Sequence, residues 1–214
     1  MFNLDPIQML YRLPAIIIGL SFHEFAHAYV SDRLGDPTPR SQGRLTLSPI
    51  PHIDIIGFIL ILVVGFGWAK PVQINPRHYK NLRRDEALVS IAGPLMNLLL
   101  AFVFTFIMKM LFLFGPQLNL SEKLGIIIYN IVDYCIFINI ILFIFNLIPL
   151  PPLDGSHVLF SILPRRFYKI FHFLEQYGTI IFIIIVVTPI ASYILSPISN
   201  YIYDNLMNLF RIGL

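Results

Sequence analysis

Long apolar runs are the feature that most constrains this chain. A helix needs roughly 20 consecutive apolar residues to span a bilayer, and four stretches reach or approach that length, at residues 6–30, 87–114, 124–148 and 178–198. Of the 214 residues, 57% are hydrophobic and only 13% are charged, which is outside the usual composition of soluble proteins. The sequence therefore predicts an all-α integral membrane protein, a helical bundle of about four to six transmembrane helices.

The whole chain, residues 1–214, is interpreted as one membrane-embedded domain, because no repeat or polar linker divides it. The first run lacks the basic start and cleavage site of a signal peptide, so we expect it to be retained. The single cysteine, Cys135, excludes an intrachain disulfide and a thiolate zinc cluster. Nucleotide-binding loops and basic helices are absent from the sequence, so the expected surroundings are the lipid bilayer and not nucleic acid. The oligomeric state stays open.

The apolar run 53–66 is too short to span as a helix, because its 14 residues cover about 21 Å of a core of roughly 30 Å. Short loops rich in Lys and Arg stay in the cytoplasm. If the run dips into the membrane and returns, one side collects eleven Lys and Arg, and the short loop on the opposite side has Lys123 alone. If the run spans the membrane, eight of these basic residues lie on one side and four on the other. We therefore favour a re-entrant segment and an N-terminus outside the cytoplasm. The eleven residues are Arg33, Arg40, Arg44, Lys70, Arg77, Lys80, Arg83, Arg84, Arg165, Arg166 and Lys169.

Residues 23–27 read His-Glu-Phe-Ala-His within the first apolar run. On a helix this spacing puts His23 and His27 on one face, where both imidazoles could bind one Zn²⁺. Glu24 could then act as general base on a water that the metal activates. The motif also occurs by chance, and structural hydrogen bonding between helices is an alternative. Because ionisable groups in the middle of an apolar run are costly in a bilayer, we favour a functional site.

A catalytic zinc site needs a third protein ligand, and the favoured candidate is Asp154 in FNLIPLPPLDGSHVL (145–159). Three prolines end the preceding helix, so irregular backbone presents this carboxylate. Such backbone at membrane depth is tolerated only beside protein or a water-filled cavity. Two alternatives remain: Asp154 could cap a helix that opens at Gly155, or His157 could be the ligand instead.

The order of these motifs resembles the site-2 protease family of intramembrane metalloproteases. HEFAH, AGPLMN (92–97) and FNLIPLPPLDG follow one another as they do in that family. GRLTLSPIPHID (43–54) and GWAKPVQINP (67–76) are similar to its short prokaryotic members, which lack PDZ and CBS domains. The resemblance implies one zinc ion per chain and regulated intramembrane proteolysis.

The resemblance also implies roles for individual residues. The implied zinc ligands are His23, His27 and Asp154, and the implied base is Glu24. Asn146 is implied to lie near the site, and Asn97 in the catalytic region, where either could bind substrate or support the transition state.

Substrates implied by the resemblance are single-pass membrane proteins, cut within or near their transmembrane segments. The protein is then a multi-pass protein of the cell membrane, with its active site nearer the cytoplasmic face. A cleaved segment must be extended. The piece GRLTL (43–47) could pair as a strand, and segment 68–80 is predicted to be extended because Pro71 and Pro76 break helices. Either edge could hold a substrate strand.

Two other functions remain as alternatives. A membrane metal transporter would also place His and Asp inside the bilayer, and a silent scaffold would bind no metal. Some polar residues have simpler interpretations: Asn130, Asp133 and Asn139 as contacts between helices, and His52 with Asp54 as either an interfacial or a gating pair. The tail 199–214 could lie in the membrane interface or pack as an ordinary helix.

Overall fold

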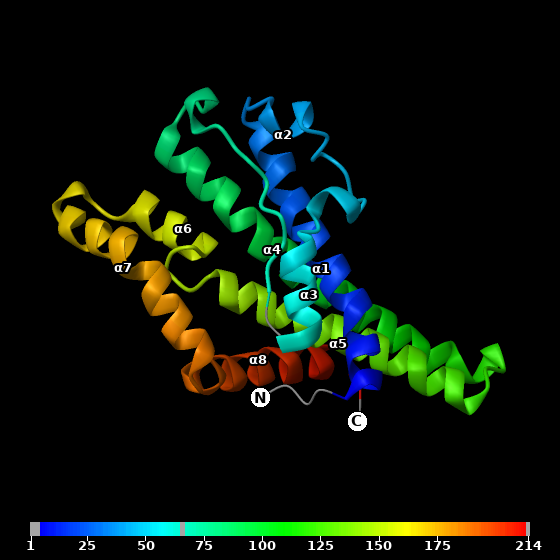
Figure 1. Cartoon of the computed structure of the whole chain (residues 1–214). Helices are drawn as coiled ribbons and strands as arrows, with labels where there is room; N and C mark the ends of the chain where they lie inside the picture. The colour runs from blue at the N-terminus through cyan, green and yellow to red at the C-terminus, as the bar shows by residue number, and fades with distance from the viewer. Residues whose placement is uncertain (1–4, 65–66, 213–214) are drawn as a thin grey trace.

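The computed structural model describes residues 5–64 and 67–212, and within them it is helical, without strands. Four of the described helices are long and apolar enough to cross a membrane: α1 (Pro6–Arg33), α4 (Leu82–Phe114), α5 (Glu122–Asn146) and α7 (Tyr168–Val187). This confirms the predicted all-α membrane fold (Figure 1). The shorter elements are α2 (Thr38–Ser41), η1 (Ile50–His52), α3 (Ile55–Val64), η2 (Pro76–His78), η3 (Gly115–Leu118), α6 (Asp154–Ile162), η4 (Arg165–Phe167) and α8 (Ile190–Leu209).

The long helices begin at polar caps. The side chain of Asp5 accepts a hydrogen bond from the backbone of Ile7 at the start of α1. Asn81 caps α4 and Ser121 caps α5 in the same way. A side-chain oxygen at the cap satisfies a backbone N–H that has no partner inside the helix.

Helices α1, α4 and α5 pack together and form the frame of the molecule. The core between α4 and α5 contains Ala101 and Met108 from α4 with Val132, Ile136 and Ile140 from α5. Helix α8 covers this core through a row of side chains, so the described part of the tail is a packed helix. The covering side chains include Ile202, Tyr203, Leu206 and Met207.

After the short apolar run, the chain turns back toward the start of that run. Its helix, α3, has 10 residues, about 15 Å, and the chain after it comes back to the start of α3. The Lys70 N–H donates to the His52 carbonyl oxygen at 2.9 Å. Gly57 allows this close return, because a Cβ there would lie 2.2 Å from the carbonyl oxygen of Trp68. The geometry agrees with the predicted re-entrant path; residues 65 and 66 lie outside the described residues.

The expected strand at GRLTL is wrong. Residues 45–47 form bends, and side chains bind backbone carbonyl oxygens here in place of a strand ladder. The His52 Nε2 donates to the Thr46 carbonyl oxygen at 2.8 Å, and the Arg44 guanidinium donates to the carbonyl oxygens of Pro51 and Lys70. Segment 68–75 is extended, as predicted, but the predicted stretch 68–80 is interrupted by η2 at Pro76–His78, because Pro76 fits the first position of a helical turn.

The fourth predicted span, 178–198, is misplaced. Helix α7 ends at Val187, Thr188 is extended, and α8 begins at Ile190. Pro189 explains the break, since it has no N–H to continue the helix and forces the residue before it out of helical geometry. The spanning helix is α7, which begins ten residues earlier than the predicted run.

Candidate metal centre

The two histidines of the HEFAH motif lie side by side on α1. One helical turn separates them, and their Nε2 atoms are 3.0 Å apart. Both residues are buried. The prediction that one face of the first helix presents both imidazoles is therefore confirmed.

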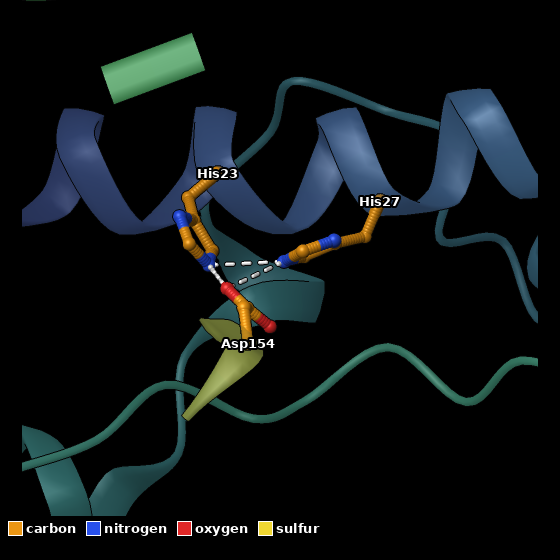
Figure 2. Close-up of side chains that lie close together, drawn as sticks. All are labelled: His23, His27 and Asp154. Atoms are coloured by element: carbon orange, nitrogen blue, oxygen red, sulfur yellow. Dashed lines mark hydrogen bonds and ion pairs between the residues drawn. The ribbon is translucent and has the colours of Figure 1, made fainter. Parts of the chain in front are cut away.

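Asp154 reaches these histidines from the other half of the sequence. It is the first residue of α6, and its Oδ2 lies 3.1 Å from the His23 Nε2 and 3.3 Å from the His27 Nε2 (Figure 2). Leu153 occupies the cap position of α6, without a side-chain cap bond. The carboxylate of Asp154 thus points to the histidines and not to its own helix, which removes the capping alternative.

The protonation pattern of the site calls for a cation. The His27 Nδ1 lies 2.7 Å from the Val89 carbonyl oxygen, which can only accept, so this nitrogen carries the proton. The His23 Nδ1 lies 2.7 Å from the Asn97 Oδ1. In the neutral imidazoles, both Nε2 atoms then keep lone pairs that face the Asp154 Oδ2, a buried atom without a hydrogen-bond partner among the described residues.

Zinc fits these three atoms. Ligand atoms 2.0–2.1 Å from a tetrahedral zinc lie about 3.3–3.4 Å from one another, close to the separations of 3.0, 3.1 and 3.3 Å found here. Two imidazole nitrogens and a carboxylate oxygen are also the ligand types of catalytic zinc sites. The side chain of Asp154 keeps 21% of its surface exposed, so the group can be reached from one side.

Gly93 on α4 provides the space for both imidazoles. A Cβ at this position would lie 2.3 Å from the His27 Nε2 and 2.7 Å from the His23 Nε2. Any side chain on Gly93 would overlap the rings. The AGPLMN motif therefore belongs to the site through its glycine as well as its asparagine.

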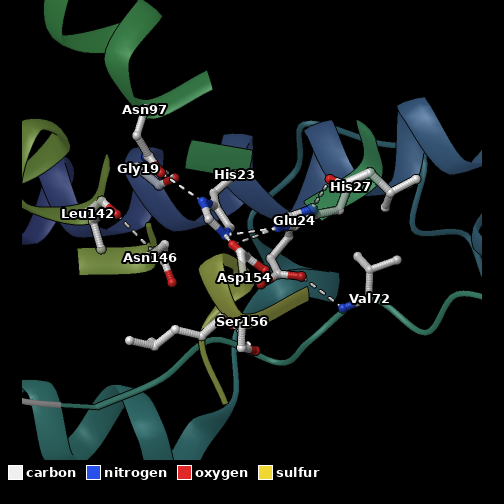
Figure 3. A network of polar contacts seen from close by, with 12 residues as sticks. Gly19, His23, Glu24, His27, Val72, Asn97, Leu142, Asn146, Asp154 and Ser156 are labelled. Carbon is white, nitrogen blue, oxygen red and sulfur yellow. Dashed lines mark hydrogen bonds and ion pairs between the residues drawn. The ribbon is translucent and has the colours of Figure 1, made fainter. Parts of the chain in front are cut away.

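Glu24 lies beside the three candidate ligands. Its side chain is largely buried, and its Oε2 accepts a hydrogen bond of 2.8 Å from the Val72 N–H in the extended segment (Figure 3). This contact holds the carboxylate at the edge of the site, where α1 meets segment 68–75.

The two asparagines predicted to support the site differ in position. Asn97 is completely buried, and its amide contacts His23, Gly19 and Asn139. Asn146, the last residue of α5, uses one amide hydrogen to donate to the Leu142 carbonyl oxygen at 3.0 Å. Both lie in the region that Figure 3 shows, and their contact with substrate stays a prediction.

The alternative candidates have structural contacts. The His157 Nδ1 lies 3.6 Å from Glu86 and does not join the metal-binding group among the described residues. His52 is buried and binds the loop backbone. Asp54 accepts from the Gly57 N–H at the start of α3. These bonds favour structural roles over the gating pair.

Asp36 is a residue that the sequence analysis missed. Its carboxylate accepts hydrogen bonds from the Ser31 hydroxyl and from the N–H groups of Thr38 and Asn75, which ties the extended segment to the end of α1. Burial alone would raise the pKa of Asp36, but these hydrogen bonds stabilise its ionised form and lower the pKa below its usual value. Asp36 is therefore ionised at neutral pH, where it keeps its hydrogen bonds to the end of α1 and to the extended segment. The GDPT turn was the available signal, because Asp often binds nearby backbone in such turns.

Comparison with known proteins finds relatives named as zinc metalloproteases. The sequence model of peptidase family M50 matches residues 114–189, which include Asn146 and Asp154. "Putative zinc metalloprotease YwhC" of Bacillus subtilis is 42% identical over 206 residues, 96% of this chain and 93% of that protein. "Putative zinc metalloprotease MJ0611" of Methanocaldococcus jannaschii is 32% identical, over 73% of each chain. No solved structure matches the chain.

Proposed function

This chain belongs to peptidase family M50, the site-2 protease family of zinc metalloproteases, and from that premise we propose that it cleaves single-pass membrane proteins within or near their transmembrane segments. The observation that carries the proposal is the position of the ligands. His23 and His27 lie within a helix long and apolar enough to cross the membrane, and Asp154 joins them from α6. A hydrolytic site on such a helix reaches peptide bonds at membrane depth.

The chain supplies the proton transfers of hydrolysis. His23, His27 and Asp154 would hold the zinc ion, which when bound would supply the Lewis acidity that makes water a nucleophile at neutral pH. The Glu24 carboxylate takes a proton from the attacking water and returns it to the leaving amine. Since the Val72 N–H binds one oxygen of Glu24, the other oxygen is left for the proton.

A substrate helix must unwind before it can be cut, because its peptide groups are bonded to one another. Segment 68–75 offers extended backbone beside Glu24, and an unwound substrate strand would pair with it as an added β-strand. Asn146 would then bind the strand or the developing oxyanion with its second amide hydrogen. The Arg44 side chain binds this segment at Lys70, and the Asp36 carboxylate binds it at Asn75.

The proposal is tested by mapping cleavage sites. Membranes from cells that carry the intact chain are expected to contain fragments of single-pass proteins whose new ends map inside or next to transmembrane segments. Peptide mass spectrometry of the termini measures this, and cells without the chain are the control. New ends that map only to soluble domains would contradict membrane-depth cleavage.

The basic residues support an orientation with the site nearer the cytoplasm. The loops after α1 and before α4 lie at one end of the molecule, and the turn between α4 and α5 lies at the opposite end (Figure 1). Eleven Lys and Arg belong to the loops and helix ends assigned to the first side, and the short turn on the other side has Lys123; the remaining three, Arg12, Lys109 and Arg211, lie in α1, in α4 and after α8. His27 lies six residues, about 9 Å, before the end of α1 at Arg33.

Cysteine labelling tests the orientation. In a Cys135→Ala background, a membrane-impermeant maleimide added to intact cells is expected to label Lys123→Cys but not Arg77→Cys, because both positions are exposed and the proposed orientation puts them on opposite sides of the membrane. Permeabilised cells, in which both should react, are the control. Labelling of Arg77→Cys alone in intact cells would reverse the orientation.

A further inference from the structure

We propose that Asn139 and Asn97 form a one-way hydrogen-bond relay across three helices, which holds His23 in the tautomer that offers its Nε2 to the metal. The inference rests on the zinc site of the proposed function. It makes both asparagines positioning residues, which act on the metal through His23.

The relay runs from α5 through α4 to α1. The Asn139 Nδ2 donates to the Cys135 carbonyl oxygen at 2.8 Å. The Asn97 Nδ2 donates to the Asn139 Oδ1 at 2.9 Å and to the Gly19 carbonyl oxygen at 3.0 Å. The Asn97 Oδ1 then faces the His23 Nδ1 at 2.7 Å. Asn97 and Asn139 are completely buried, so water does not substitute for these partners.

Two backbone carbonyls fix the direction of the relay. The Cys135 oxygen can only accept, so Asn139 must turn its NH₂ toward it and its oxygen toward Asn97. The Asn139 and Gly19 oxygens then both face Asn97, which must turn its NH₂ toward them. Its own oxygen is left for His23, whose Nδ1 must donate. Turning either amide around would bring acceptors face to face inside the protein, and unpaired buried polar groups are costly.

A single hydrogen bond holds His27 in the same tautomer. Its Nδ1 donates directly to the Val89 carbonyl oxygen at 2.7 Å, a backbone group that cannot change its role. The tautomer of His23 depends instead on two side chains from separate helices. The state of His23 is thereby coupled to the packing of α5 on α1, whereas that of His27 is not.

Gly19 makes the close packing possible. A Cβ at Gly19 would lie 2.8 Å from the Leu142 Cδ1 and 3.1 Å from the Asn139 Oδ1. Its absence lets α5 approach α1, and its carbonyl oxygen supplies the second acceptor for Asn97. The sequence predicts that Asn139 is a contact between helices. In the relay, the fixed order of donors and acceptors at this contact also affects the metal site.

Zinc affinity in a double-mutant cycle tests the relay. Purified protein is titrated with a competing chelator, and the absorption spectrum of the Co²⁺-substituted protein reports the ligand geometry. Asn97→Leu is expected to weaken zinc binding about 10–100-fold, the usual loss when the partner of a metal-binding histidine is removed. Asn97→Asp keeps an acceptor oxygen for His23 but turns its second oxygen toward the acceptor oxygens of Gly19 and Asn139, so it is expected to bind zinc less tightly than the wild type and more tightly than Asn97→Leu.

Asn139 distinguishes the relay from simple helix packing. Asn139→Leu alone should weaken zinc binding by about threefold, because Gly19 still holds Asn97. In the Asn97→Leu background the same change should have no further effect, since Asn139 acts only through Asn97. Losses that multiply, or an Asn97→Leu protein with unchanged affinity and Co²⁺ spectrum, would overturn the relay while leaving the zinc site intact. A wild-type protein that binds no zinc would overturn the zinc site itself, and the relay with it.

Discussion

Glu24→Gln is expected to abolish proteolysis and leave zinc binding intact. Glutamine has nearly the same size, and its side-chain oxygen can still accept the Val72 N–H that now binds the Glu24 carboxylate at 2.8 Å. The amide cannot take a proton from water, so both proton transfers lose their carrier. General acid–base catalysis contributes about 10²–10⁴-fold in rate, and we expect a loss of at least that size. The three ligand residues are unchanged.

The measurement pairs activity with metal content in the same purified sample. Zinc is determined by elemental analysis, and cleavage by the appearance of fragments from a single-pass substrate. Glu122→Gln, the same substitution at an exposed position in the first turn of α5, is the matched control and should retain activity. Undiminished cleavage by Glu24→Gln would remove Glu24 from the mechanism. Loss of zinc together with cleavage would show that its role is structural.

Local spacing was enough to predict half of the metal centre. His23 and His27 are one helical turn apart, so the geometry of any α-helix places them together. Asp154 could be proposed only because the proline-rich LDG segment predicts irregular backbone at membrane depth. Such backbone is tolerated only beside protein or a water-filled cavity, which indicates a functional site. The fit of its Oδ2 between the two imidazoles required the packed structure.

The contacts that the sequence did not predict are between segments without periodicity. Asp36 binds Asn75 across 39 positions, and Arg44 reaches the carbonyl oxygen of Lys70. Nothing in the spacing of loop residues marks such partners. The expected strand at 43–47 failed for the same reason, since the His52 side chain binds the Thr46 carbonyl oxygen and the Arg44 side chain binds that of Pro51. The misplaced fourth span shows the reverse case, a break that Pro189 could have indicated.

Gly93→Ala is expected to remove zinc from a protein that still folds. The new Cβ would lie 2.3 Å from the His27 Nε2, 2.6 Å from the His23 Cε1 and 2.7 Å from the His23 Nε2. These atoms are at the ends of rotatable side chains, so the rings can turn away without moving α1 or α4. Turning them separates their nitrogens from the Asp154 Oδ2. We expect zinc below one-tenth occupancy, by analogy with the about 10–100-fold losses in affinity that follow mutation of residues that orient metal ligands, and no detectable cleavage.

The chain contains a matched control for this prediction. Gly125 lies in α5, and a Cβ there would meet nothing within 4 Å. Replacing a helical glycine by alanine stabilises a helix by about 0.5–1 kcal/mol when space is free, so Gly125→Ala should keep full zinc content and activity, with an equal or higher unfolding temperature. Gly93→Ala should elute as the same folded species in detergent while lacking the metal. Full zinc occupancy in Gly93→Ala would mean that the two imidazoles do not occupy the place described here, and that α4 does not form a wall of the metal centre.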